Sequence, residues 1–321
     1  MRGLLFLAAL FTGALAIGSA AAQTYPAKAI RIIVPFTPGS ATDVMGRIVS
    51  ERLNAAWGQP VIVDNKPGAG GSIGIREGSR ADPDGYTLVL VSSGHAVNHV
   101  LYKDLGYDTL KDFSAVAMLG SLPSVLIVPP TSPVSSVKEL VAMLKAKPGQ
   151  YNYASAGVGS GAHVSLAKFN VAAGVKAVHV PLKGTPPILA ETMAGRVEYA
   201  MVPAVSGMGP VRDGKVKALA VSTSKRVAAL PNVPTLGEAG FPDGESTFWL
   251  ALLAPAKTPA EIVAKVNAAV NRALSSQDMV ERLAKLGTEP MAMSPAEADA
   301  FIAREYHELG KIMRDAGLKP Q

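Results

Sequence analysis

Two stretches of this chain decide its fold: Ile32-Ile33-Val34-Pro35-Phe36-Thr37-Pro38-Gly39-Ser40-Ala41-Thr42-Asp43 and Tyr151-Asn152-Tyr153-Ala154-Ser155-Ala156-Gly157-Val158-Gly159-Ser160-Gly161-Ala162-His163. Each reads as a strand, a glycine turn and the start of a helix. The first N–H groups of a helix lack partners within it, and its N-terminus carries a partial positive charge. Each stretch therefore predicts an anion site built without a charged side chain. Two such loops facing each other would clamp a carboxylate.

Strand-like and helix-like segments alternate along the rest of the chain. The predicted strands are 30–35, 61–63, 86–91, 125–128, 152–155, 177–180, 197–202, 218–223 and 248–254; the predicted helices are 41–57, 72–79, 135–147, 162–173, 186–194, 259–274, 278–286 and 295–316. This rhythm predicts an α/β fold with mainly parallel sheets. Because ligands bind at the carboxyl ends of such strands, the glycine turns should gather at one cleft between domains.

The division into domains follows from length and from the absence of a single linker. About 300 residues favour two domains. The apolar strands at 124–129 and 249–255 each end in proline and are the predicted crossovers. Residues 23–124 together with 249–321 would then form one discontinuous domain, and residues 125–248 would form the other.

Residues 1–22 read as a cleavable signal peptide. Arg2 supplies the positive start, residues 4–17 are apolar, and Ala20-Ala21-Ala22 fits the cleavage pattern. The alternative, a membrane anchor, needs about 20 apolar residues, more than this stretch provides. Cleavage before Gln23 would leave 299 of the 321 residues (321 − 22). We therefore expect an exported protein of the periplasm.

Composition excludes several classes of function. The chain has no cysteine, so disulfides, thiolate chemistry and cysteine metal sites are excluded. The formal charge is +6, from 31 Lys and Arg against 25 Asp and Glu, and removing Arg2 leaves +5. No run of five basic residues is present, so nucleic-acid binding is not expected.

Two patterns in the chain resemble cofactor sites only in part. The glycines of Gly157–Gly161 miss the Gly-x-Gly-x-x-Gly spacing of a dinucleotide loop. His95 and His99 stand four residues apart but without the further ligands of a metal site. We therefore expect no cofactor and no metal. Loops that offer backbone amides and hydroxyls suit binding rather than nucleophilic catalysis, so we expect no enzyme activity.

The ordered motifs resemble one family, and the match covers nearly all of the chain after residue 22. The motifs are Val34-Pro35-Phe36 with Gly39 and Thr42-Asp43; Asn65-Lys66-Pro67-Gly68-Ala69-Gly70-Gly71; Pro83-Asp84-Gly85-Tyr86-Thr87-Leu88; Tyr153-Ala154-Ser155 with Gly157, Gly159-Ser160 and His163; His179-Val180-Pro181-Leu182-Lys183-Gly184; Ala218-Leu219-Ala220-Val221; Leu230-Pro231-Asn232-Val233-Pro234-Thr235; and Ala254-Pro255. They resemble the periplasmic solute receptors of tripartite tricarboxylate transporters, the Bug family. The resemblance implies a two-domain type II periplasmic-binding-protein fold that closes like a flytrap, a carboxylate ligand and membrane permease subunits as partners.

The resemblance also implies site residues, carried over position by position. They are Phe36, Gly39, Ser40, Ala41, Thr42 and Asp43 in the first loop, Ser155, Gly157, Gly159, Ser160 and His163 in the second, and Ser92, Ser93 and His95 after the third strand. Thr185, in a third glycine loop, and Pro203, at a strand end, complete the predicted site. We expect the Asp43 carboxylate to cap its helix, as Thr42 could, because a carboxylate would repel an anion.

Two departures from the family pattern bear on specificity. Ser40 stands where the first loop usually has a second glycine, and its hydroxyl would either join the site or narrow it. The strand after Glu198 usually delivers an acidic residue to the cleft, but Tyr199-Ala200-Met201-Val202-Pro203 contains none. This absence argues against an amino-acid ligand, whose ammonium would need a carboxylate.

The main hypothesis is a monomeric exported receptor that captures a small carboxylate and delivers it to a tripartite-type permease. The alternative is a sensor that passes the same bound state to a membrane kinase. A periplasmic enzyme is a third, weaker reading. Ligand identity and affinity stay open.

Overall fold

The computed structural model describes residues 25–315, 317–318 and 320. The predicted signal peptide, residues 1–22, lies outside these described residues. Among the helices of the described part, none combines the length and the apolar character that a bilayer span requires.

The chain folds into ten strands and ten α-helices within the described residues. The strands are β1 (Ile30–Val34), β2 (Val61–Asn65), β3 (Thr87–Ser92), β4 (Phe113–Leu122), β5 (Ser124–Val128), β6 (Asn152–Ser155), β7 (Val178–Pro181), β8 (Tyr199–Pro203), β9 (Lys217–Val221) and β10 (Phe248–Pro255). The helices are α1 (Ala41–Trp57), α2 (Ser72–Ser79), α3 (Asn98–Leu101), α4 (Val137–Ala146), α5 (Gly161–Ala173), α6 (Thr185–Met193), α7 (Ala204–Arg212), α8 (Ala260–Leu274), α9 (Gln277–Lys285) and α10 (Pro295–Asp315), with short 3₁₀ turns η1 (Ala69–Gly71), η2 (Ser93–Ala96) and η3 (Pro242–Gly244).

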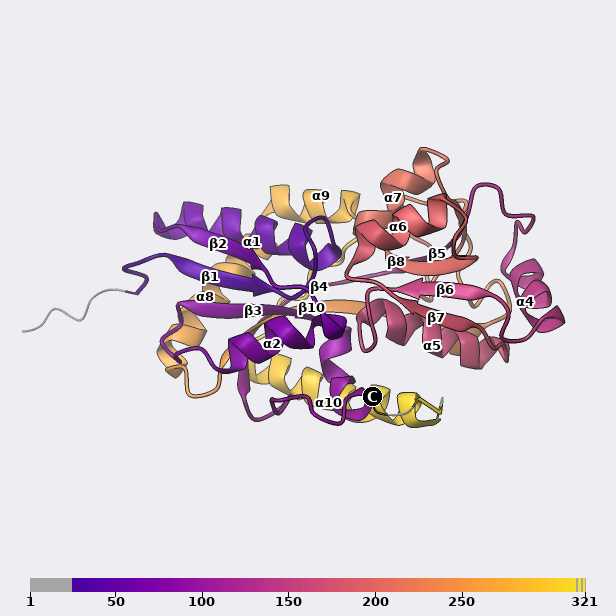
Figure 1. The fold of residues 1–321 in the computed structure, drawn as a ribbon. Helices are drawn as coiled ribbons and strands as arrows, with labels where there is room; N and C mark the ends of the chain where they lie inside the picture. Colours follow the sequence, from indigo (N-terminus) through magenta and orange to yellow (C-terminus); the bar gives the residue numbers. More distant parts are fainter. Residues whose placement is uncertain (1–24, 316, 319, 321) are drawn as a thin grey trace, which may run out of the picture.

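Two five-stranded sheets with the same topology form the two halves of the molecule (Figure 1). Sheet A has the order β2-β1-β3-β10-β4, and sheet B has the order β7-β6-β8-β5-β9. In each sheet one strand runs against the other four: β10 is antiparallel to β3 and β4, and β5 is antiparallel to β8 and β9. The α/β expectation is confirmed, and each reversed strand is the one by which the chain enters that sheet from the other.

The chain passes between the sheets twice. It crosses at Pro123, between β4 and β5, and returns between β9 and β10. The crossings thus lie just before the predicted crossover strands, which each pair within one sheet only. Ser222 joins the two passages: its hydroxyl donates to the Ser246 carbonyl (2.7 Å) and accepts from the Ser124 N–H (3.0 Å).

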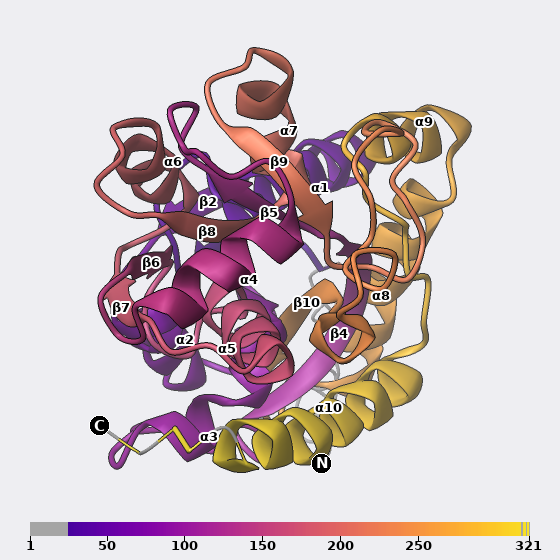
Figure 2. The same cartoon turned by 90° about the vertical axis from the view of Figure 1, so that its right-hand side faces the viewer.

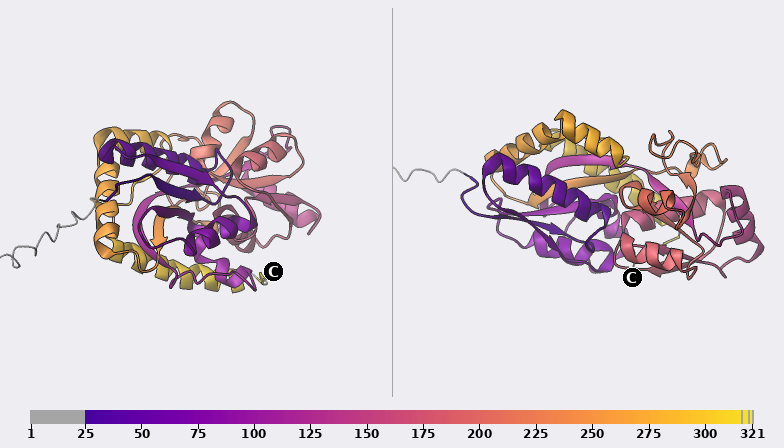
Figure 3. Two further views of the ribbon diagram at one scale, coloured as in Figure 1. Left: turned by 60° about the vertical axis from the view of Figure 1, so that its left-hand side comes forward. Right: turned by 90° about the horizontal axis from the view of Figure 1, so that it is seen from above.

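Helices cover both faces of each sheet because buried strand residues alternate between two cores. In β1, Ile32 packs in the core beneath α1 and α8, whereas Ile33 packs in the core on the side of α2 and α10. In sheet B, one core contains residues of α4 and α5, and the other contains residues of α6 and α7. Figure 2 shows α4 and α5 in front of sheet B. Figure 3 shows α10 running beneath both halves, and its Met313 packs beside Val164 of α5.

Local features differ from the sequence analysis at β4, at α7 and at the start of α1, and the one-turn helix α3 was not predicted either. Strand β4 was not predicted, because it is buried on both faces and lacks the alternation of a half-buried strand. Helix α7 was not predicted, because it contains two glycines and Pro210. The N-cap of α1 is Ser40, with extended backbone and no side-chain capping bond, so the prediction of Thr42 or Asp43 at that position was wrong.

Candidate functional site

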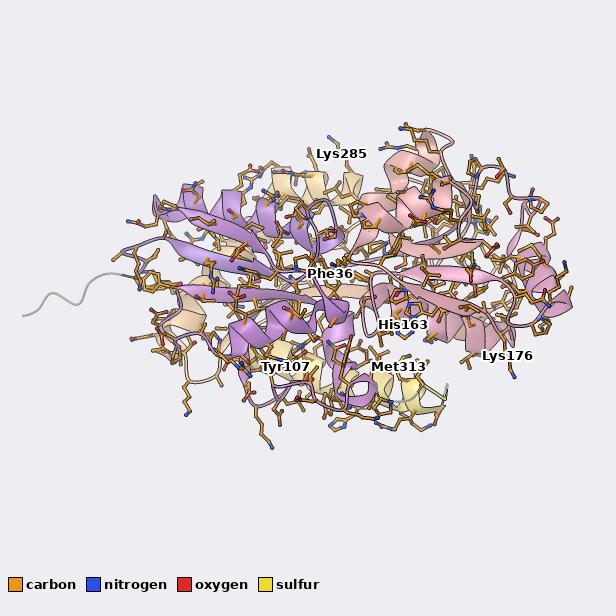
Figure 4. The ribbon with its side chains drawn as sticks, in the orientation of Figure 1. Phe36, Tyr107, His163, Lys176, Lys285 and Met313 are labelled. Carbon is orange, nitrogen blue, oxygen red and sulfur yellow. The ribbon has the colours of Figure 1, made fainter. Side chains whose placement is uncertain are left out.

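The two glycine loops face each other at the junction of the sheets, around a small cavity of about 20 Å³. In Figure 4 the labelled Phe36 and His163, one from each loop region, lie near this junction. Eight residues of the predicted site line the cavity: Phe36, Ser40, Ala41, Thr42, Ser92, Ser160, Thr185 and Pro203. Ala156, Gly161, Ala162 and Phe248 complete the lining, and none of the twelve side chains is charged.

The first loop is held by Asp43. Gly39, at a φ of +81°, donates its N–H to Asp43 Oδ2 (2.9 Å). The same carboxylate accepts from Asn65 (3.0 Å) and from Arg47 (3.0 Å). Burial raises the pKa of Asp43, but the bonds from Arg47, Gly39 and Asn65 outweigh burial and bring that pKa below its ordinary value. Asp43 therefore shapes the loop from behind the cavity, and the Gly39 amide is not free for a ligand.

The second loop is held by two histidines. The His179 Nε2 and Ser155 Oγ atoms are 2.6 Å apart, and Ser155 Oγ accepts the Gly157 N–H (3.1 Å). His163 Nδ1 accepts the Gly159 N–H (3.2 Å), and the two imidazole rings stack with centroids 4.3 Å apart. Burial lowers the pKa of His163 to about 3 and that of His179 to about 4. Both rings are neutral at pH 7, as the acceptor role of His163 requires.

The free donors lie one step further along each helix. In α1, Ser40 Oγ donates to the Thr37 carbonyl (2.7 Å) and lies 3.1 Å from Thr42 Oγ1. Within the described residues, the backbone N–H groups of Ala41 and Thr42 have no hydrogen-bond acceptor. The same holds for Gly161 and Ala162 at the start of α5, where Ser160 caps the helix through the His163 N–H. Two helix N-termini thus point orphan amides at one cavity.

The other eight residues of the predicted site do not line the cavity, and most of them lie in or beside the two loops. These residues are Gly39, Asp43, Ser93, His95, Ser155, Gly157, Gly159 and His163. Ser93 is buried against Gly161. His95 lies elsewhere: its ring stacks on Tyr107 and meets the edge of Phe113. Sequence reasoning missed Gly161 and Ala162, although the sequence held a signal for them. The backbone N–H groups without a partner are those of the first helical residues, not those of the glycines before the helix. No pattern identified Ala156 or Phe248.

The halves are in direct contact around the cavity. Tyr102 Oη donates to the Val158 carbonyl (2.7 Å), and Ser206 Oγ donates to the Gly39 carbonyl (3.2 Å). Glycines make this approach possible, because a Cβ on Gly70 would overlap the Val158 carbonyl oxygen. The arrangement is that of a closed cleft with little free space.

One sequence pattern outside the loops has an enzymatic reading. Gly70-Gly71-Ser72-Ile73-Gly74 matches the Gly-x-Ser-x-Gly motif of hydrolases. Ser72 begins α2 after the 3₁₀ turn η1 rather than directly after a strand, and it is buried. Within the described residues it has no hydrogen bond to a histidine, so the geometry of an activated nucleophile is missing here.

Two facing lobes with reversed entry strands and an interdomain cavity define a periplasmic binding protein. Solved structures agree: BugD superposes with a TM-score of 0.88 at 30% identity, over 92% of this chain and all of that one. An R. palustris protein solved with adipate has a TM-score of 0.89 at 32% identity, over 92% of this chain and 100% of that one. MatC from Rhodopseudomonas palustris, with bound malate, has a TM-score of 0.85 at 33% identity, over 90% of this chain and 99% of that one.

The sequence comparisons narrow the class to a family. Residues 45–318 match the model described as tripartite tricarboxylate transporter family receptor. BugT of Bordetella pertussis is 37% identical over 302 residues, which cover 93% of this chain and 92% of BugT. The chain belongs to the tripartite tricarboxylate transporter receptor family, and the resemblance found from its motifs is confirmed.

Proposed function

We propose that this protein is the periplasmic receptor of a tripartite-type transporter and binds a small carboxylate in the cleft between its lobes. The observation that carries the proposal is the pair of helix N-termini, α1 and α5, whose free amides face one uncharged cavity. Each N-terminus is equivalent to about half a positive charge. Amide donors and a positive potential without a cationic side chain suit a carboxylate.

Relatives support the ligand class. Two family structures hold adipate and malate, which are small dicarboxylates. The hydroxyls of Ser92 and Thr185, which have no protein hydrogen bond within the described residues, would hold the second polar end. In this proposal the leader, residues 1–22, is removed on export. Residues 23–124 with 249–321 and residues 125–248 then close as two bodies around the ligand, without catalysis, and the closed monomer docks on the permease.

The test is calorimetric titration of the purified chain after unfolding and refolding to strip any carried ligand. The panel holds malate, adipate, benzoate and glutamate. We expect binding of at least one carboxylate and weaker binding of glutamate, because Tyr199–Pro203 offers no carboxylate for its ammonium. No binding across the panel by a folded chain rejects the proposal.

A pair of proline variants tests the amide donors. Ala41→Pro removes one amide at the first position of α1, where proline is tolerated and the preceding Ser40 is already extended. Losing a charge-assisted hydrogen bond costs about 1.5–3 kcal/mol, so affinity should fall about tenfold or more. Ala260→Pro makes the same change at the start of the distant α8 and should leave affinity unchanged. Equal affinities in the two variants would reject the role of α1.

Uptake decides between transport and sensing. A strain that lacks this chain should lose uptake of the bound carboxylate and regain it with the wild-type chain. Retained uptake with loss of a transcriptional response would support the sensor reading instead.

A further inference from the structure

A second cavity lies against sheet A, between α10 and the loop that precedes β4. Its volume is about 310 Å³. Its walls are mostly apolar, with Phe113, Leu253 and Ile302 among them, and the half-exposed Leu110 marks its opening to solvent. In Figure 4 the labelled Tyr107, whose ring stacks on His95 of this cavity, lies beside α10 and apart from Phe36 and His163.

His95 is the first polar group of this cavity. The side chain is 2% exposed, and neither ring nitrogen has a hydrogen-bond partner of good geometry in the described residues. Burial lowers the pKa of His95 to about 4, although the backbone carbonyl of Thr109 opposes the shift. The ring is therefore neutral at pH 7. With its N–H turned toward that carbonyl, the other nitrogen is a free acceptor.

Thr109 and Asp299 supply two more acceptors. Thr109 Oγ1 is buried without a partner in the described residues. Asp299 on α10 uses Oδ1 to accept the Ala115 N–H (2.8 Å) and forms no ion pair with any described residue. Burial raises the pKa of Asp299, as expected for a carboxylate without a cation beside it. Unpartnered buried polar groups cost about 1–3 kcal/mol each, so the His95 ring and the Thr109 hydroxyl beside one cavity need an explanation.

We propose that this cavity binds a small organic amine as its ammonium cation. An ammonium group has three N–H donors and no acceptor. The cavity offers three acceptors, one each from His95, Thr109 and Asp299, and its lining contains no cationic side chain. The apolar walls cover an alkyl body, and Asp299 excludes anions. The site is thus opposite in charge preference to the cleft, and its ligand is a different molecule from the carboxylate.

The test follows the histidine rings by NMR. The chain has five histidines, so their ring C–H signals can be resolved and His95 can be assigned from a His95→Gln variant. The full chain is titrated at pH 7.5 with isoamylamine and, separately, with isoamyl alcohol, which has the same alkyl body without the charge. We expect the amine to shift the His95 signal saturably, to leave those of His163 and His179 in place, and to bind more tightly than the alcohol.

Two carboxylate variants locate the charge. Asp299→Asn keeps an oxygen for the Ala115 N–H but loses the negative charge, and should weaken amine binding by about tenfold or more. Glu308→Gln removes an exposed carboxylate from the same helix and should bind as the wild type does. The proposal is overturned if the His95 signal does not move, if the amine shifts His163 or His179 instead, if the alcohol binds as tightly as the amine, or if Asp299→Asn binds like the wild type.

Discussion

The substitution Gly94→Ala tests whether cleft closure is part of ligand binding. Gly94 lies in η2, on the lobe of sheet A, and faces the second glycine loop of the other lobe. A Cβ at this position would overlap the Gly159 carbonyl oxygen and lie 2.9 Å from the Gly161 nitrogen. Gly94 is not among the glycines with a positive φ, so alanine adds no backbone strain in the open form. The substitution should therefore act on the closed form alone.

The expected loss of affinity follows from the overlap. Forcing extra carbon into a packed contact costs about 1–3 kcal/mol. A cost of about 2 kcal/mol corresponds to an affinity roughly 30 times weaker. At a ligand concentration about 100 times the wild-type dissociation constant, ligand stabilises the wild type by about 2.7 kcal/mol and the variant by about 0.9 kcal/mol. Thermal unfolding should show the ligand-induced rise in Tm shrink by several degrees.

A matched glycine gives the control. Gly209, in α7, has no atom within 4 Å of a built Cβ, so Gly209→Ala should bind ligand as the wild type does. Calorimetry of both variants gives the dissociation constants, and unfolding without ligand gives their stabilities. Wild-type affinity in Gly94→Ala would refute the closed cleft as the bound state. A drop in unliganded stability as large as the loss of binding energy would assign Gly94 to folding instead.

Three further substitutions test the groups that hold the loops and the crossing. Asp43→Asn should lower the free energy of unfolding at pH 7 by about 1–3 kcal/mol. Because the folded-state pKa of Asp43 is lowered, the stabilisation by its carboxylate is present above about pH 4 and is lost below that pH. The stabilities of variant and wild type, measured by urea titration, should therefore converge in acid. His163→Asn keeps an acceptor for the Gly159 N–H but cannot titrate. Because the folded-state pKa of His163 is lowered to about 3, the wild type loses stability as pH falls below about 6.5, and the variant should lose less. Urea midpoints of both proteins at pH 7 and pH 4.5 measure the difference. Ser222→Ala removes a buried hydroxyl that is bonded to both crossing passages, and it should lower the free energy of unfolding by about 1–3 kcal/mol in chemical denaturation. An alanine substitution at an exposed serine should cause a smaller loss.

Sequence reasoning succeeded where local chemistry fixes an element. The bounds of α1 and α2 were predicted to the residue, because Gly58 at a φ of 63° ends the first and a glycine turn precedes the second. It failed at β4, whose ten residues are buried on both faces, and such a strand is recognised only by its partner β10. Tertiary contact, not propensity, makes that segment a strand.

The site shows the same division between local and distant causes. The two glycine loops could be located from sequence, since strand, turn and helix start are local features. Which of their backbone amides are free to bind a ligand could not be predicted. Whether the Gly39 and Gly159 amides are free depends on Asp43 and His163, four residues later, folding back to accept them. The orientation of His95 depends on Tyr107 and Phe113, which a strand-end position does not reveal.

Charge separates the two cavities. The cleft is lined by no charged side chain, so its preference for an anion comes from two helix ends whose direction is fixed by the fold. Such a site selects its ligand by the position of the amides and by the shape of the cavity walls. It therefore suits a receptor family whose ligands share a carboxylate but differ in the rest of the molecule. The cavity beside α10 takes its preference from one carboxylate, Asp299, which a single substitution can remove. Loss of charge should therefore abolish selectivity at the second cavity, whereas the first has no side-chain charge to lose.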